Sequence, residues 1–123
     1  MSNFEGPVTI ESTGSAVEFS GIGFRPDHLE LRVGPKNNSA ALVQKCEGFV
    51  DEGGYYGCFS EYIDATSSEQ KRFDNKVLYH RERVGGTLST VIEATFHSFT
   101  NDGFKLNISQ ASANYDVWIS ASN

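Results

Sequence analysis

The chain has 123 residues, and 10 Lys and Arg against 16 Asp and Glu give it a formal net charge of −6. This length suits one compact domain and is too short for two, so we expect a single domain over residues 1–123. The acidic balance argues against a nucleic-acid partner, whose binding surface normally carries a basic excess. No apolar stretch is long enough to span a bilayer, and the first residues lack the segments of a signal peptide, so we expect no membrane partner.

Alternation of apolar and polar residues is the main structural signal in the sequence. Leu29, Leu31 and Val33, for example, alternate with Glu30 and Arg32. The same period of two recurs in six segments: 8–11, 17–20, 29–33, 91–97, 104–109 and 115–121. A period of two predicts half-buried β-strands with one dry and one wet face.

Turn residues separate these segments. Asn101-Asp102-Gly103 is the strongest hairpin signal, Gly53-Gly54 and Gly85-Gly86 mark further reversals, and Pro26-Asp27 and Pro35-Lys36-Asn37-Asn38 bracket the strand around Leu31. The best helical candidate is Thr66–Phe73, where a Ser or Thr cap predicts one or two surface turns. We therefore predict an all-β fold of about eight or nine strands, as a two-sheet antiparallel β-sandwich or jelly roll, with a closed barrel as the alternative.

The residue types that usually carry catalysis form no recognisable pattern. Cys46 and Cys58 flank the Gly53-Gly54 turn, so a hairpin would bring them together, either as a disulfide or, as the lack of a secretion signal favours, as thiols. His97 falls on the polar side of its strand and His80 in a charged run, which predicts solvated positions for both. With no nucleophile motif and no metal-ligand spacing, we expect neither an enzyme nor a cofactor or metal site.

The aromatic residues are the strongest functional signal. In the run 55–62, alternation places Tyr56, Cys58 and Tyr62 on one face and Tyr55, Phe59 and Ile63 on the other. Trp118 lies opposite the core face that its neighbours occupy. Exposed aromatics of this kind either pack in a subunit interface, as in a trimer, or stack on sugar rings. The candidate partner or glycan contacts are Tyr55, Tyr56, Phe59, Tyr62 and Trp118.

Three segments in a fixed order carry a family resemblance. In 19–31, the run Gly23-Phe24-Arg25-Pro26 matches a "glycine, aromatic, any residue, proline" turn before an alternating strand; 99–108 matches a serine-phenylalanine, turn, glycine-phenylalanine hairpin; and 115–121 matches a closing strand that ends in a small residue. Together they resemble a family of small proteins and C-terminal modules of tailed bacteriophages and prophages, especially those of actinobacteria. In this pattern Pro26 sets the chain before its strand, and Gly103 is expected to supply a turn conformation that other residues disfavour.

The resemblance implies a virion component, either associated with the tail or decorating the capsid, that forms trimers or other closed oligomers. A weaker similarity is to the H-type lectins, β-sandwiches that bind sugars at trimer clefts. The leading hypothesis is a non-enzymatic structural protein of the virion, assembled in the host cytoplasm, that contacts other virion proteins and contributes to host-surface attachment. The alternative is a lectin-like carbohydrate-binding module that recognises a host glycan.

Overall fold

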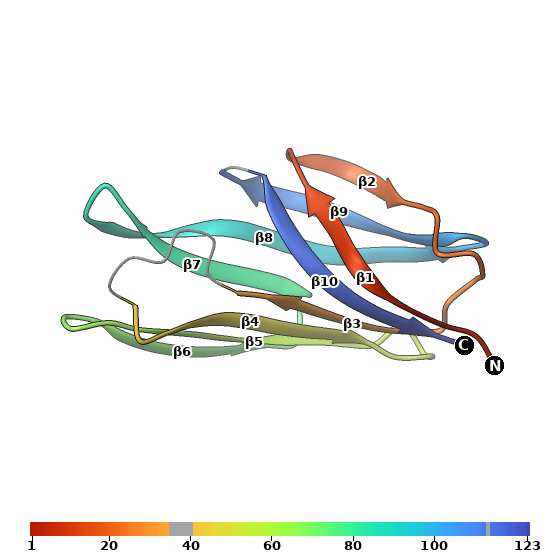
Figure 1. The fold of residues 1–123 in the computed structure, drawn as a ribbon, viewed down its shortest axis with the longest axis horizontal. Helices are drawn as coiled ribbons and strands as arrows, with labels where there is room; N and C mark the ends of the chain where they lie inside the picture. Colours follow the sequence, from red (N-terminus) through yellow and green to blue (C-terminus); the bar gives the residue numbers. More distant parts are fainter. Residues whose placement is uncertain (35–40, 113) are drawn as a thin grey trace.

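The computed structural model describes residues 1–34, 41–112 and 114–123, and over these ranges the chain forms ten β-strands in two antiparallel sheets. The six-stranded sheet contains, in spatial order, β1 (Asn3–Ile10), β10 (Tyr115–Ser122), β3 (His28–Val33), β4 (Val43–Val50), β5 (Tyr56–Ile63) and β6 (Ser68–Phe73). The four-stranded sheet contains β2 (Gly14–Phe19), β9 (Gly103–Ala111), β8 (Thr87–Thr100) and β7 (Leu78–Val84). Figure 1 shows the sheets as stacked layers, which confirms the predicted β-sandwich with ten strands instead of eight or nine.

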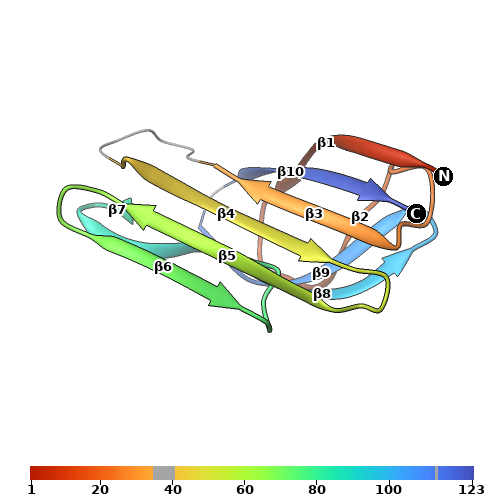
Figure 2. The same ribbon diagram turned by 90° about the horizontal axis from the view of Figure 1, so that it is seen from below.

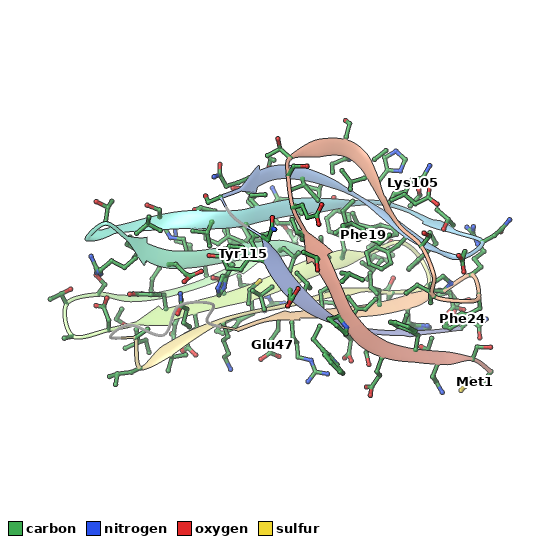
Figure 3. The ribbon with its side chains drawn as sticks, turned by 45° about the horizontal axis from the view of Figure 1, so that its top comes forward. Met1, Phe19, Phe24, Glu47, Lys105 and Tyr115 are labelled. Carbon is green, nitrogen blue, oxygen red and sulfur yellow. The ribbon has the colours of Figure 1, made fainter. Side chains whose placement is uncertain are left out.

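The core lies between the sheets and follows the predicted alternation. In β3 the residues Leu29, Leu31 and Val33 are buried, and the intervening side chains are exposed. The same holds in β10, whose inward positions begin at Tyr115 and whose outward positions include Trp118. Figure 3 shows Phe19 and Tyr115 between the two sheets. Burial of apolar area on both inner faces supplies the main stabilising free energy of this architecture.

The predicted reversals occur where the glycines are. Gly85 and Gly86 form a two-residue turn between β7 and β8, with φ angles of 58° and 84°. Gly54 in the β4–β5 loop also has a positive φ, of 82°. Strand β3 begins directly after Pro26-Asp27, as predicted, whereas the turn predicted at 35–38 lies outside the described residues.

The β8–β9 hairpin is present, but the expected role of its glycine is wrong. Asn101 and Asp102 form the turn, and Gly103 already belongs to β9, where it pairs with Thr100 and lacks a positive φ. A Cβ atom at Gly103 would lie 1.9 Å from the carbonyl oxygen of Phe19. Gly103 is therefore required because the backbones of β2 and β9 approach closely there, a role that glycine also fills.

Asp102 links the segment that follows β2 to this hairpin through hydrogen bonds. Its carboxylate accepts hydrogen bonds from the backbone N–H groups of Gly21 (2.9 Å) and Gly23 (2.7 Å). Beside it, the rings of Phe19 and Phe104 stack with centroids 5.2 Å apart. The first two segments of the family resemblance thus pack against each other, so their residues form part of the fold itself.

The predicted helical turns at Thr66–Phe73 are wrong, because most of this segment forms the edge strand β6. Thr66 and Ser67 donate backbone hydrogen bonds to the Asp64 carboxylate in the loop before it. The strand then pairs with β5 over six residues. Pairing with an existing sheet outweighs the local preference of a short polar segment for helical turns. Over the described ranges, the chain contains no helix with the length and hydropathy needed to cross a bilayer.

Candidate functional site

The outer face of the six-stranded sheet, which points away from the four-stranded sheet, carries exposed aromatic side chains. Trp118 of β10 is 45% exposed, Phe49 of β4 is 49% exposed and Phe59 of β5 is 39% exposed. Figure 2 looks onto this sheet from below, and Figure 3 shows Glu47 projecting from the same face. Large aromatics gathered on one face mark it as a candidate interaction surface.

Strand register places five of the outward side chains in one line. Trp118 is paired with Arg32, Arg32 with Glu47, Glu47 with Phe59, and Phe59 with Arg72. We call these five residues the aromatic–arginine row. The row crosses β10, β3, β4, β5 and β6 at right angles to the strands. Its length is about 19 Å, from four strand spacings of about 4.8 Å.

The charges of the row are unevenly compensated. The Glu47 carboxylate forms an ion pair with Lys45 Nζ at 3.4 Å on the same strand. Among the ion pairs and side-chain hydrogen bonds of the described residues, none involves Arg32 or Arg72. Both guanidinium groups therefore keep all of their hydrogen-bond donors available to a ligand.

Hollows lined by described residues open on this outer face. One of about 770 Å³ is lined by Phe49, Glu5 and Ser120 among others, and the Ser120 hydroxyl donates to Glu5 Oε1 at 2.8 Å. A second, about 450 Å³, is lined by Phe59 and Arg72, and a third, about 150 Å³, by Arg32 and Glu47. Glu30 lines all three hollows. The two smaller hollows therefore lie at the row, between Arg32 and Arg72, and the hollow of about 770 Å³ lies beside it.

The structure separates the five aromatic residues singled out by sequence. Phe59 and Trp118 both belong to the row, and Tyr55 is 75% exposed in the β4–β5 loop. Tyr56 instead points inward, with its ring 6.1 Å from that of Phe96. Tyr62 is buried, and its hydroxyl donates to Asp64 at 2.7 Å. The predicted separation of Tyr56, Cys58 and Tyr62 from Phe59 is confirmed, and it leaves Tyr56 and Tyr62 off the outer face, whereas Tyr55 precedes β5 and lies outside the strand.

Sequence reasoning missed Arg32, Arg72 and Phe49. Arg32 was visible as an outward position of an alternating strand, but nothing local indicated that its neighbour across the sheet is Trp118. Phe49 follows Gly48, which interrupts the apolar alternation of β4. Arg72 lies in the segment predicted to form helical turns. A strand assignment for 68–73 would have been the signal needed to find it.

A second group of titratable side chains lies in the core, and it corrects the prediction for His80. His80 and Glu82 point inward from β7 and are buried, whereas His97 is exposed as predicted. The Tyr115 hydroxyl donates a hydrogen bond to Glu82 Oε2. Burial lowers the pKa of His80 to about 4, against the opposing influence of Glu82, and raises that of Tyr115. The charged sequence of residues 80–83 predicted exposure for His80, whereas only Arg81 and Arg83 face outward.

Cys46 and Cys58 face the core from adjacent strands as free, buried thiols. They are diagonal neighbours, since Cys46 is paired with Ser60 and Cys58 with Gly48. The Tyr79 backbone N–H donates to Cys46 Sγ at 3.3 Å, and the hydrogen bond with Cys46 together with burial raises the pKa of Cys58. Within the described part of the chain, no three His, Cys, Asp or Glu side chains are arranged to hold a metal ion.

Comparisons of the chain with protein-family models, with curated proteins and with solved structures gave no match. The resemblance carried by segments 19–31, 99–108 and 115–121 therefore stays a prediction from sequence. The outer face and its aromatic–arginine row are the features from which a function must be argued.

Proposed function

We propose that the protein is a non-enzymatic structural component of a tailed-bacteriophage particle, either a minor tail protein or a capsid decoration protein. In this proposal the outer face of the six-stranded sheet is its attachment surface. The observation that carries the proposal is the aromatic–arginine row, which combines exposed rings with arginines that lack partners within the described chain. The three sequence segments support the phage assignment.

The physical basis is the free energy that this face gains when it is covered. Aromatic and arginine side chains dominate the binding free energy of protein interfaces, because aromatic rings bury a large area and arginine offers directed hydrogen bonds. Trp118 and Phe59 are held on a rigid sheet, so little conformational entropy is lost when a partner packs on them. Closed oligomers are the usual solution for such subunits, and we propose a trimer.

The test is the composition of purified particles. Quantitative mass spectrometry should find the chain in them, at a few copies for a tail protein and at hundreds for a capsid decoration protein. Changing Trp118 and Phe59 together to Ala should reduce incorporation at least about tenfold, the usual effect of losing an interface hot spot. The matched control is Val84→Ala, which removes a 56% exposed apolar side chain in β7. Absence from particles, or equal incorporation of both variants, contradicts the proposal.

A lectin-like carbohydrate-binding module is the second candidate function. The observation that favours it is the set of hollows beside exposed rings, because a sugar needs both a ring to stack on and a groove with polar groups. A glycan array followed by titration of Trp118 fluorescence tests it. Absence of binding to all host glycans tested contradicts this candidate. The composition of the particles then decides the first candidate, a structural protein of the virion.

A further inference from the structure

We propose that the aromatic–arginine row binds an anionic glycan. Each aromatic–arginine pair holds one sugar ring together with the carboxylate or phosphate that the ring carries. This inference rests on the second candidate function, the carbohydrate-binding module, in which the outer face is open to solvent, and it names the class of glycan that this face takes. In this inference Arg32 and Arg72 contact the ligand together with the exposed rings.

The geometry of the row is a repeated unit. Trp118 and Arg32 are direct cross-strand neighbours on β10 and β3, and Phe59 and Arg72 are direct cross-strand neighbours on β5 and β6. Directly opposite residues have Cβ atoms about 5 Å apart, so each guanidinium lies within reach of a ring stacked on its neighbour. The second pair follows the first after three strand spacings, about 14 Å. An oligosaccharide of a few rings lying across the strands would engage both pairs.

The chemistry of each pair suits an acidic sugar. The flat face of Trp118 or Phe59 packs on the apolar C–H face of a sugar ring. The planar fork of Arg32 or Arg72 donates two parallel hydrogen bonds to a carboxylate or phosphate, and Arg is favoured over Lys for this geometry. Among the described residues neither guanidinium has another acceptor, so binding breaks no existing ion pair.

The carboxylates of this face restrict which anionic glycan fits. Glu47 lies between Arg32 and the Phe59–Arg72 pair and is compensated by Lys45. Glu30 lines the adjoining hollows and has no ion pair among the described residues. An anionic group above either carboxylate would be repelled, whereas a hydroxyl would donate a hydrogen bond. The row therefore favours a glycan whose charged sugars are separated by uncharged ones.

The experiment titrates the purified protein with hyaluronan, which carries a carboxylate on alternate sugars, and with its neutral methyl ester as the matched ligand. A teichoic acid built of disaccharide 1-phosphate repeats, with one phosphate for every two sugars, provides the phosphate arm. Trp118 is the only tryptophan of the chain and reports directly on the row. We expect a saturable change in its emission with hyaluronan or the teichoic acid, at least about tenfold weaker binding of the ester, and weakening with added salt.

Two variants and one control complete the design. Arg32→Ala and Arg72→Ala should each weaken binding at least about tenfold, because each removes a charge-assisted hydrogen-bond pair. They lie on different strands, so the loss of one through misfolding leaves the other informative. The matched control is Lys105→Ala, which removes one positive charge from β9 in the other sheet and should bind as wild type.

Three results would overturn the inference. Equal binding of hyaluronan and its ester would show that charge is not recognised. Unchanged binding in both arginine variants would place the ligand elsewhere. Absence of binding to both anionic polymers would remove the ligand class altogether, while the particle composition would still decide the proposed function independently.

Discussion

The buried histidine of β7 makes the stability of this protein depend on pH in a defined window. His80 is fully buried, both of its ring nitrogens lack a hydrogen-bond partner among the described residues, and its ring meets that of Tyr115 edge-on with centroids 5.9 Å apart. Removal from water disfavours the imidazolium and lowers the pKa of His80 from 6.5 to about 4. The nearby Glu82 opposes this effect without cancelling it.

The sign follows from proton binding in the two states. Between about pH 4 and pH 6.5 the unfolded chain binds a proton at His80 and the folded chain does not, so the free energy of unfolding falls as the pH falls through this window. A pKa lowered from 6.5 to about 4 corresponds to about 3 kcal/mol of stability lost once both states are protonated. This is a large part of the 5–15 kcal/mol of a typical domain.

Urea denaturation followed by far-ultraviolet circular dichroism, at pH values from about 7 down to about 4.5, measures this dependence. The variant His80→Leu removes the titrating ring and two unsatisfied buried nitrogens, so we expect it to fold and to lose most of the slope. His97→Leu is the matched control, because His97 is exposed on β8. That control should keep the slope of the wild type.

Carboxylates with a lowered pKa change the free energy of unfolding only below the pH range in which His80 acts. The pKa of Asp64 is lowered by hydrogen bonds from Tyr62, Thr66 and Arg83, so its contribution is lost only at lower pH. Constant stability of the wild type between about pH 6.5 and pH 4.5, or retention of the full slope by His80→Leu, would refute the role of His80 in this pH dependence.

Three further predictions follow from close contacts in the fold. A Cβ at Gly48 would lie 1.9 Å from the Val77 carbonyl oxygen, so Gly48→Ala should lower the free energy of unfolding by about 3 kcal/mol in urea titrations. A Cβ at Gly34 would meet no atom of the described residues within 4 Å, so Gly34→Ala should change the free energy of unfolding by less than about 1 kcal/mol, and an equal effect of both variants would contradict the close approach. Cys46 and Cys58 are buried, so a thiol reagent should modify them only on unfolding, and rapid modification of the native protein would show that they are accessible. Asp102→Ala should lower the melting temperature because it removes the acceptor of two backbone hydrogen bonds, and Asp102→Asn, which keeps one oxygen, should lower it less; calorimetry showing no change in either variant would refute this role.

Much of the fold was available from local sequence. The alternation at 29–33, 104–109 and 115–121 predicted strands because a period of two reflects the pleat of the backbone itself. Gly85-Gly86 predicted a reversal because both positions need a positive φ. These patterns depend only on neighbouring residues, so they can be interpreted without knowledge of the partner strand.

The errors arose where a distant partner decides the structure. Residues 68–73 form a strand because β5 offers an edge to pair with, and their own sequence contains no alternating apolar signal. His80 is buried because β7 turns positions 78, 80 and 82 toward the core, which a charged run conceals. Gly103 is needed because the backbone of Phe19 approaches it from a strand more than eighty residues earlier.

The candidate site divides in the same way. Sequence alone determined that the chain is acidic and all-β, that Trp118 points away from the core, and that Phe59 lies on the opposite face of its strand from Tyr62, because the direction of a side chain on a strand depends on its position in the alternation. Only the tertiary structure set Arg32 beside Trp118 and Arg72 beside Phe59. The order of strands in a sheet depends on hydrogen bonds between segments far apart in the chain, so no local pattern could bring the row together.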